Sequence, residues 1–221
     1  AAAEAMIAYT ADTRDPAREA AHLRFSAEIF PQLEEQGVRL ARRLVATGFT
    51  RPDLEVVLRR FGSGIEIFRG EKPPLFGELA ELSASYQRLT GGITVEWEGE
   101  TRTLPQLGPF LKSPDRAVRE RAFRAMGAPY VAMRDQLAGL FDEMYSRRQR
   151  VARNAGFADF EAYSFAAKCR FDYTPDDVTR FHEAVEAEVV PAVARILELR
   201  KQALGLEVLR PWDLDVDPAS R

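Results

Sequence analysis

Three dipeptides in which a capping residue precedes proline set the helical character of this sequence: Asp15-Pro16, Ser113-Pro114 and Thr174-Pro175. Side-chain oxygens of Asp, Ser and Thr accept hydrogen bonds from the first free N–H groups of a helix. Proline fits the first helical position because that N–H has no partner within the helix. Asp176 and Asp177 add negative charge to the first turn of the third start, where the helix dipole favours it. Apolar residues follow at helical spacing, so the sequence predicts a mainly α-helical protein.

Proline and glycine predict where these helices bend and end. Pro31 and Pro191 interrupt helical patterns, so we expect each to kink or divide its helix, because proline removes a backbone hydrogen bond. Gly62-Ser63-Gly64 predicts a helix interruption rather than a phosphate-binding loop, since no strand precedes it and no Lys-Ser/Thr pair follows. Gly127 and Pro129 predict a local break in the helix opened by Ser113-Pro114. Helix ends are predicted at Gly48, Gly91-Gly92, Asn154–Phe157 and Gly205.

One stretch has the pattern of a β-hairpin. Ile93–Trp97 alternates apolar and polar residues, and Glu98-Gly99-Glu100 turns the chain into a second run. We therefore expect a hairpin over about residues 93–104. Trp97 is expected to pack on neighbouring helices, and its presentation to a partner is the weaker alternative. A β-prone exit segment is predicted near the C-terminus, at about residues 207–214. We expect it to form an exposed or edge strand, since Pro211 cannot donate to a β-ladder. The expected fold is a mainly α lobe of long helices with these two β features.

Composition limits the function classes. Hydrophobic residues make up 46% and charged residues 29% of the 221 residues, which is typical of a folded domain. The net charge of −3 gives no overall attraction to nucleic acid or anionic membranes. No apolar run approaches the ~20 residues of a membrane span. One cysteine, Cys169, and an N-terminal stretch unlike a signal peptide favour a cytoplasmic location. Without a His, Asp or Asn constellation, Cys169 is interpreted as a small packed residue rather than a nucleophile.

Four arginines lie within seven residues: Arg147, Arg148, Arg150 and Arg153. On a helix they spread around the axis, because successive residues turn by ~100°. We interpret them as an ion-paired or solvated helix surface. Contact with a substrate carboxylate and nucleic-acid binding are weaker hypotheses, and the second lacks the interleaved aromatic residues that such surfaces use.

The two histidines do not complete a metal site. A zinc-peptidase helix needs histidines at positions i and i+4, with the intervening glutamate as base. The segment His182–Glu186 has glutamate at the second ligand position, and His22 is distant in sequence. We therefore predict neither a bound metal nor a catalytic residue in this chain.

The segment from Met144 to Pro218 carries a family resemblance. Its runs RRQRVARNAGFADFEAYSF, RFDYTPDDVTRF and VVPAVARILELRKQALGLEVLRPWD resemble oligoendopeptidase F, a branch of the thimet-oligopeptidase-like zinc metallopeptidases. The run ITVEWEGE is similar to the N-terminal lobe of that family. The resemblance implies an N-terminal portion that lacks the His-Glu-x-x-His helix, so that the zinc ligands lie outside this sequence. We expect both chain ends to be cuts in a longer protein.

The resemblance also implies a function. The chain would form the substrate channel of a zinc-dependent oligoendopeptidase that hydrolyses short peptides, would be inactive alone, and would have the missing C-terminal catalytic lobe as its partner. Arg170, Tyr173 and Trp212 are the candidates for lining the substrate cleft, being polar or aromatic residues at junctions between elements. Two domains are predicted: a helical subdomain with the hairpin (1–112), and a long-helix segment leading toward the catalytic lobe (113–221). The alternative is a non-enzymatic helical interaction module, whose apolar faces would need a partner.

Overall fold

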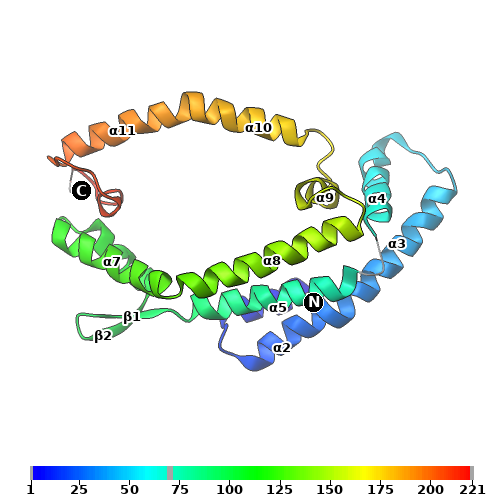
Figure 1. The fold of residues 1–221 in the computed structure, drawn as a ribbon, viewed down its shortest axis with the longest axis horizontal. Coiled ribbons are helices and arrows are strands. Elements are labelled where there is room, and N and C mark those ends of the chain that lie inside the picture. Colours follow the sequence, from blue (N-terminus) through cyan, green and yellow to red (C-terminus); the bar gives the residue numbers. More distant parts are fainter. Residues whose placement is uncertain (1, 69–71, 220–221) are drawn as a thin grey trace. The chain divides into compact units, whose positions relative to one another are not determined.

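A computed structural model describes residues 2–68 and 72–219, of which residues 72–74 are described by their backbone alone. The described chain is mainly α-helical with one two-stranded hairpin (Figure 1), as the sequence predicts. No helix within these ranges is both long enough and apolar enough to cross a membrane.

The chain forms two compact units, each built from two segments. The first unit contains Ala1–Gly91 and Ala138–Val178, and the second contains Gly92–Leu137 and Thr179–Arg221. The predicted division into residues 1–112 and 113–221 stays a prediction.

The helices of the first unit are connected by short turns. They are α1 (Ala2–Ala11), α2 (Pro16–Arg24), α3 (Phe30–Ala46), α4 (Glu55–Ile67, after the 3-10 turn Pro52–Leu54), α5 (Lys72–Gly91), most of α8 (Arg134–Asn154), α9 (Phe160–Ala167) and the start of α10 (Pro175–Ala184). The Asp15 carboxylate caps α2, as predicted, and the Asp159 carboxylate caps α9 in the same way. Positive φ angles at Gly48 and Gly156 end α3 and α8 at the predicted glycines.

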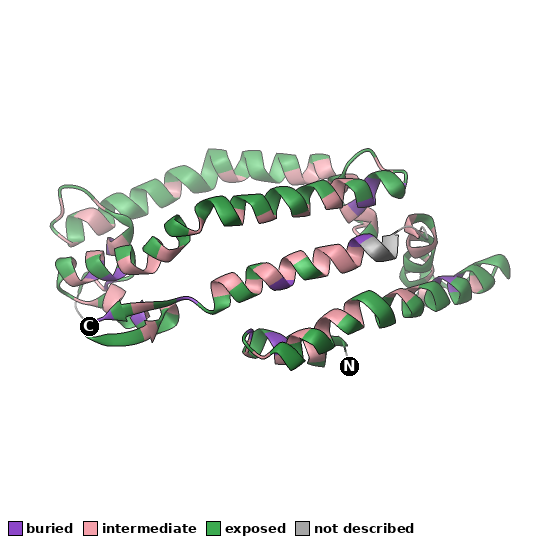
Figure 2. Ribbon diagram, turned by 60° about the horizontal axis from the view of Figure 1, so that its bottom comes forward, coloured by how far each residue is buried: buried purple, intermediate pink, exposed green. Residues whose placement is uncertain are grey.

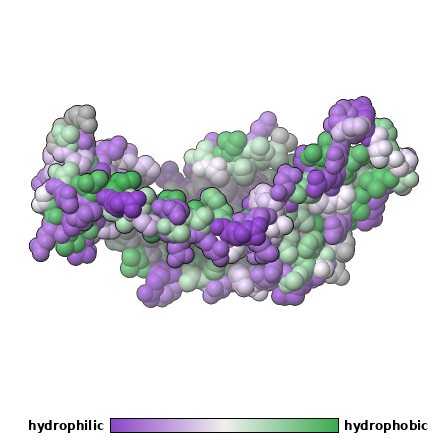
Figure 3. Space-filling model, turned by 90° about the horizontal axis from the view of Figure 1, so that it is seen from above, coloured by the Kyte–Doolittle hydropathy of each residue, from purple (hydrophilic) through white to green (hydrophobic). Residues whose placement is uncertain are grey.

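The core of the first unit lies where α5, α8 and α9 meet. Leu75, Val151, Ala152, Ala155 and Tyr163 form a buried cluster there. Buried residues are few along the helices (Figure 2), and on the face drawn in Figure 3 hydrophobic residues reach the surface in separate patches between hydrophilic ones. The helices therefore keep large apolar side chains exposed outside this small core.

Pro31 and Pro191 are accommodated by wider helical turns. A five-residue π-helical segment, Phe25–Ile29, precedes α3, and another, Val185–Val189, precedes α11 (Val190–Ala203). Each proline is the second residue of its helix, so the wide turn absorbs the hydrogen bond that proline cannot make. The predicted divisions thus take the form of π-bulges within continuous helices.

The predicted interruption at Gly62-Ser63-Gly64 is wrong, because α4 continues through all three residues to Ile67. The Ser63 hydroxyl donates a hydrogen bond to the Ala166 carbonyl at 2.8 Å, which joins α4 to α9. Added Cβ atoms at either glycine would meet no atom within 4 Å. Packing of one helix on another therefore outweighs the low helix propensity of two glycines.

The second unit contains the hairpin and the helices around it. β1 (Thr94–Trp97) pairs antiparallel with β2 (Glu100–Thr103), and the turn residues Glu98 and Gly99 both have positive φ. The unit continues through α6 (Leu104–Leu107), the 3-10 turn Gly108–Lys112, α7 (Arg116–Ala132), the end of α10, α11 and the 3-10 turn η5 (Pro211–Asp213). Trp97 is buried against Leu107 and Ala122, which confirms the packing interpretation.

Two predicted boundaries near α7 are displaced. The N-cap is Asp115 rather than Ser113, and the Ser113 hydroxyl instead accepts a hydrogen bond from the Asp115 N–H. The helix passes through Gly127 and Pro129 and breaks only at Met133. A proline close to the C-terminal end of a helix removes a single bond, so the last turn survives.

The predicted β-strand at about residues 207–214 is wrong. The segment bends after Gly205 and closes into η5, and the only sheet in the described residues is the hairpin. Pro211 is the first residue of η5, a position where its fixed φ and its missing N–H are tolerated. The segment is held by hydrogen bonds from the Arg116 and Arg119 side chains to Asp213, and not by the backbone hydrogen bonds of a β-sheet.

Candidate functional site

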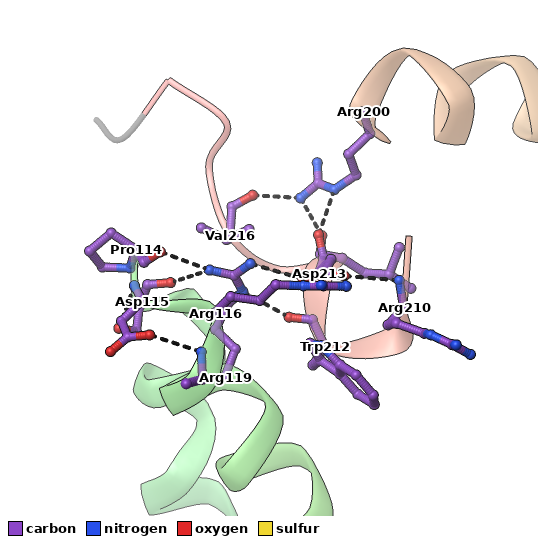
Figure 4. Close-up of polar contacts among 12 residues, drawn as sticks. Pro114, Asp115, Arg116, Arg119, Arg200, Arg210, Trp212, Asp213 and Val216 are labelled. Carbon is purple, nitrogen blue, oxygen red and sulfur yellow. Dashed lines mark hydrogen bonds and ion pairs between the residues drawn. The ribbon is translucent and has the colours of Figure 1, made fainter. Parts of the chain in front are cut away.

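The first turn of α7 directs two arginines toward the exit segment of the second unit. Arg116 and Arg119 are three residues apart, so they share one face of the helix. Asp115 accepts a hydrogen bond from the Ala117 N–H at 2.8 Å and fixes the start of this turn. Both guanidinium groups reach Asp213 in η5 (Figure 4).

Asp213 is completely buried and accepts four hydrogen bonds. Arg116 donates to both carboxylate oxygens at 3.1 and 2.9 Å, Arg119 donates at 2.9 Å, and the Arg210 N–H donates at 2.9 Å. Burial by itself would raise the pKa of the Asp213 carboxyl, but these hydrogen bonds outweigh it and lower the pKa to about 2. The carboxylate is therefore ionised at neutral pH and joins η5 to α7.

Arg119 is also fully engaged. Its side chain is 3% exposed and donates to the carbonyls of Trp212, Ser113 and Pro114 at 3.1, 2.9 and 3.0 Å. A buried charge needs such partners, because an uncompensated one costs several kcal/mol. The role of Arg119 is consequently structural.

Arg200, near the end of α11, holds the segment that follows η5. Its guanidinium donates to the Asp213 carbonyl at 3.0 Å, to the Val216 carbonyl at 2.6 Å and to the Leu214 carbonyl. Figure 4 shows the Arg200 guanidinium beside the backbone carbonyl of Asp213, whereas Arg116 and Arg119 approach the residue from the side of α7. Three arginines thus fix residues 213–216 from two helices.

Trp212 points away from this network, as Figure 4 shows. The Phe123 ring lies 5.8 Å from the indole, and the Arg124 guanidinium carbon lies 5.1 Å from the indole centroid. The indole Nε1 is buried and has no hydrogen-bond acceptor within the part of the chain that the structure describes.

Two clefts of about 490 Å³ each adjoin Trp212, and both belong to the second unit. The first, which we call the Arg210 cleft, is polar, and its lining includes Arg116, Glu120, Arg124, Glu207, Arg210 and Trp212. The second, which we call the Val131 groove, is apolar, and its lining includes Phe123, Arg124, Gly127, Ala128, Val131 and Trp212. The stacked side chains of Arg124 and Trp212 contribute to both.

The other two cleft candidates lie in the first unit. The Arg170 guanidinium carbon is 5.0 Å from the Phe165 ring centroid and 5.7 Å from that of Tyr173, and the two rings meet edge to face at 5.6 Å. Cys169, which precedes this cluster, has a φ of 53° after the end of α9, an unusual conformation for a residue other than glycine. Arg170 and Tyr173 therefore come together, while Trp212 belongs to the second unit. A substrate role for any of the three stays a prediction.

The arginine run is at least partly ion-paired, as interpreted. Arg147 contacts Glu78 at 2.8 Å and Glu143 at 3.0 Å, and Arg148 lies over the Phe160 ring at 5.8 Å. Two of the four arginines are thus in contact with residues of α5, α8 and α9.

Within residues 2–68 and 72–219, no three His, Cys, Asp or Glu side chains gather closely enough to hold a metal ion. His182 is exposed on α10, with the Phe181 ring centroid 6.2 Å away. The residues described here accordingly do not fit a zinc centre.

The arginine–aspartate network is what sequence reasoning missed. Arg116 and Arg119 precede Asp213 by 97 and 94 residues, and nothing in the local sequence patterns indicates that these side chains meet. The Asp115 start of α7 and the Pro211 turn are the local signals that could have placed their side chains.

The chain is similar to known proteins in sequence and in structure. The model of peptidase family M3 matches residues 110–217, just under half of the chain and a stretch that includes the network and both clefts. No curated protein matches the sequence.

Solved structures match nearly the whole chain. A protein described as an oligoendopeptidase F, crystallised by microfluidic seeding, is 28% identical with a TM-score of 0.92, and the alignment covers 99% of this chain and 39% of that one. PZ peptidase A, solved with an inhibitor, is 26% identical with a TM-score of 0.90, over 97% of this chain and 39% of that one. A protein from Bacillus anthracis described as an oligoendopeptidase F shares the fold at 23% identity, with a TM-score of 0.87, over 96% of this chain and 40% of that one.

The expected similarity to oligoendopeptidase F is therefore confirmed. The chain spans about two fifths of the length of the structures that it matches.

Proposed function

We propose that this chain is the N-terminal, channel-forming part of an oligoendopeptidase that hydrolyses short peptides. The observation that carries the proposal is the structural match to an oligoendopeptidase F over 99% of the chain. The family M3 match over residues 110–217 supports the same assignment independently.

The catalytic groups of the proposed enzyme lie elsewhere in the parent protein. The 221 residues contain no His-Glu-x-x-His sequence, and Glu186 stands where the second histidine would be required. We therefore assign no chemical step to this chain and propose that it is inactive alone. Zinc, held by the absent catalytic lobe, would supply the hydrolytic chemistry of the parent.

This chain would contribute one side of the substrate channel, in a fixed conformation. Asp213 and its three arginine neighbours fix the exit segment, and with it the orientation of Trp212 beside the two clefts. A cytoplasmic location remains a prediction from the sequence.

The test compares the 221-residue chain with the product of its full reading frame, using fluorogenic peptides of increasing length. We expect the short chain to cleave none of them, with or without added zinc. The full-length product should cleave the short peptides and should lose activity to a chelator. Cleavage by the short chain would refute its inactivity, and a full-length product that cleaves none of the peptides would refute the peptidase assignment.

A second candidate is a non-enzymatic helical interaction module. The observation that favours it is the exposure of large apolar residues along α11, at 56% for Val190, 62% for Ile196 and 65% for Leu199. Such faces commonly mark protein contacts. A reading frame that lacks a catalytic lobe, together with concentration-dependent self-association in sedimentation velocity, would favour the module over the enzyme.

A further inference from the structure

The Arg210 cleft and the Val131 groove together have the character of a two-part binding site. Trp212 and Arg124 line both, so a ligand that crosses this stacked pair would reach a polar region on one side and an apolar region on the other. All of these residues belong to the second unit, so the site needs no contribution from the first.

The arginines that line the Arg210 cleft differ in whether they already have an ion-pair partner. Arg116 is bound to Asp213 and to the Val208 carbonyl at 3.0 Å, and Arg124 pairs with Glu120 at 2.7 Å. Arg210 is exposed, and its guanidinium forms no ion pair with the described residues; Figure 4 shows it extending away from Asp213. An anionic group entering the cleft would therefore find its strongest free donor at Arg210, with Arg124 beside it.

The Val131 groove supplies the apolar part. Gly127 and Ala128, which have little or no side chain, line it together with Val131 and Phe123, whose side chains have exposures of 73% and 38%. A branched aliphatic side chain would cover this exposed surface, which the hydrophobic effect favours.

We propose that the second unit binds a short peptide end in which an aliphatic side chain lies in the Val131 groove and the adjacent free α-carboxylate meets Arg210 and Arg124. The carboxylate is assigned by charge complementarity with the unpaired guanidinium, and the aliphatic side chain by the character of the groove. This inference rests on the proposed function, because it names the part of a peptide substrate that the chain recognises. Glu207, which also lines the cleft, opposes the carboxylate and weakens its binding.

The test uses the fluorescence of Trp212 in the 221-residue chain carrying Trp97→Phe, so that a single indole reports. The probes are N-acetyl-leucyl-leucine, its C-terminal amide and N-acetyl-glycyl-glycine. We expect a saturable change with the first probe and a markedly weaker one with the other two, since each lacks one of the two recognised groups. If Trp97→Phe does not fold, the indole N–H cross-peak of Trp212 in the unmutated chain provides the same measurement.

Three substitutions separate the proposal from a general surface effect. Arg210→Gln should weaken the binding of N-acetyl-leucyl-leucine by about two- to fivefold, which lies within the range expected for an exposed ion pair. Glu207→Gln should tighten it, because the substitution removes a repelling carboxylate. Arg195→Gln, an exposed arginine on α11 outside both clefts, should leave it unchanged. Equal binding of acid and amide, or no effect of Arg210→Gln, would overturn the proposal.

The outcome can be separated from that of the proposed function. In the full-length protein, Arg210→Gln should raise KM for peptides with a free carboxylate and leave kcat unchanged. Cleavage with an unaltered KM would refute this site while the peptidase function stands. Binding by the short chain without any cleavage by the full-length protein would leave the site and refute the function.

Discussion

Replacement of Asp213 by asparagine should strongly destabilise the second unit. The carboxylate is completely buried and accepts from Arg116, Arg119 and the Arg210 N–H. Asparagine keeps the shape but turns one acceptor into an NH₂ donor that faces arginine donors. Breaking a buried pair costs about 3–5 kcal/mol. Because Arg119 keeps three carbonyl acceptors, we expect a loss of about 3 kcal/mol, at the lower end of that range.

The pKa of Asp213 gives the expected pH dependence. It is lowered in the folded protein from 3.8 to about 2, which corresponds to about 2 kcal/mol of stability at pH 7. A depressed carboxyl pKa stabilises the folded state above the unfolded pKa, and this stability is lost as the pH falls through the folded pKa. The contribution of Asp213 should therefore decline between about pH 4 and pH 2.

The measurement is urea unfolding followed by circular dichroism at pH 7 and pH 3. At pH 7 the midpoint of Asp213→Asn should fall by about 1 to 1.5 M. At pH 3 the difference from the unmutated chain should shrink by about 1 kcal/mol. Asp215→Asn is the matched control, because Asp215 is exposed two residues away and should change stability by less than about 0.5 kcal/mol. If Asp213→Asn behaves like this control, or if its deficit is the same at both pH values, the reasoning is refuted.

Two further predictions concern the first unit. Asp159→Ala removes the cap hydrogen bond to the Ala162 N–H at 2.8 Å and should lower the free energy of unfolding by about 1 kcal/mol, whereas Asp159→Ser should retain most of it; equal losses in urea unfolding would contradict the capping role. Burial, reinforced by the charge of Glu34, raises the pKa of Tyr163 to about 12, so ultraviolet titration should show a phenol that ionises at a pKa of about 12. Stability from that group is present below pH 10 and is lost as the pH rises toward 12; in Tyr163→Phe the late-titrating phenol should be absent, and its persistence would reject the assignment.

Local sequence determined most helix positions. The Asp15 and Asp159 caps, the positive-φ glycines and the Glu98-Gly99 turn of the hairpin all act within a few residues, so their effects could be predicted without knowing the fold. The resemblance carried by the segment from Met144 to Pro218 likewise needed only the order of residues, and the family M3 match agrees with it.

Tertiary packing decided where local rules competed. Gly62-Ser63-Gly64 stays helical, with Ser63 hydrogen-bonded to the distant α9. The local sequence of residues 207–214 resembles that of a strand, yet hydrogen bonds from α7 and α11 hold the end of this segment in a 3-10 turn.

The candidate site divides in the same way. Sequence could nominate Trp212 as an aromatic residue at a junction, but it could not place Arg124 against the indole or leave Arg210 unpaired beside it. The residues involved are almost ninety positions apart in the sequence, and only folding brings them together. Short-range capping and turn preferences are therefore encoded in neighbouring residues, whereas charge pairing and cleft formation depend on which distant helices meet.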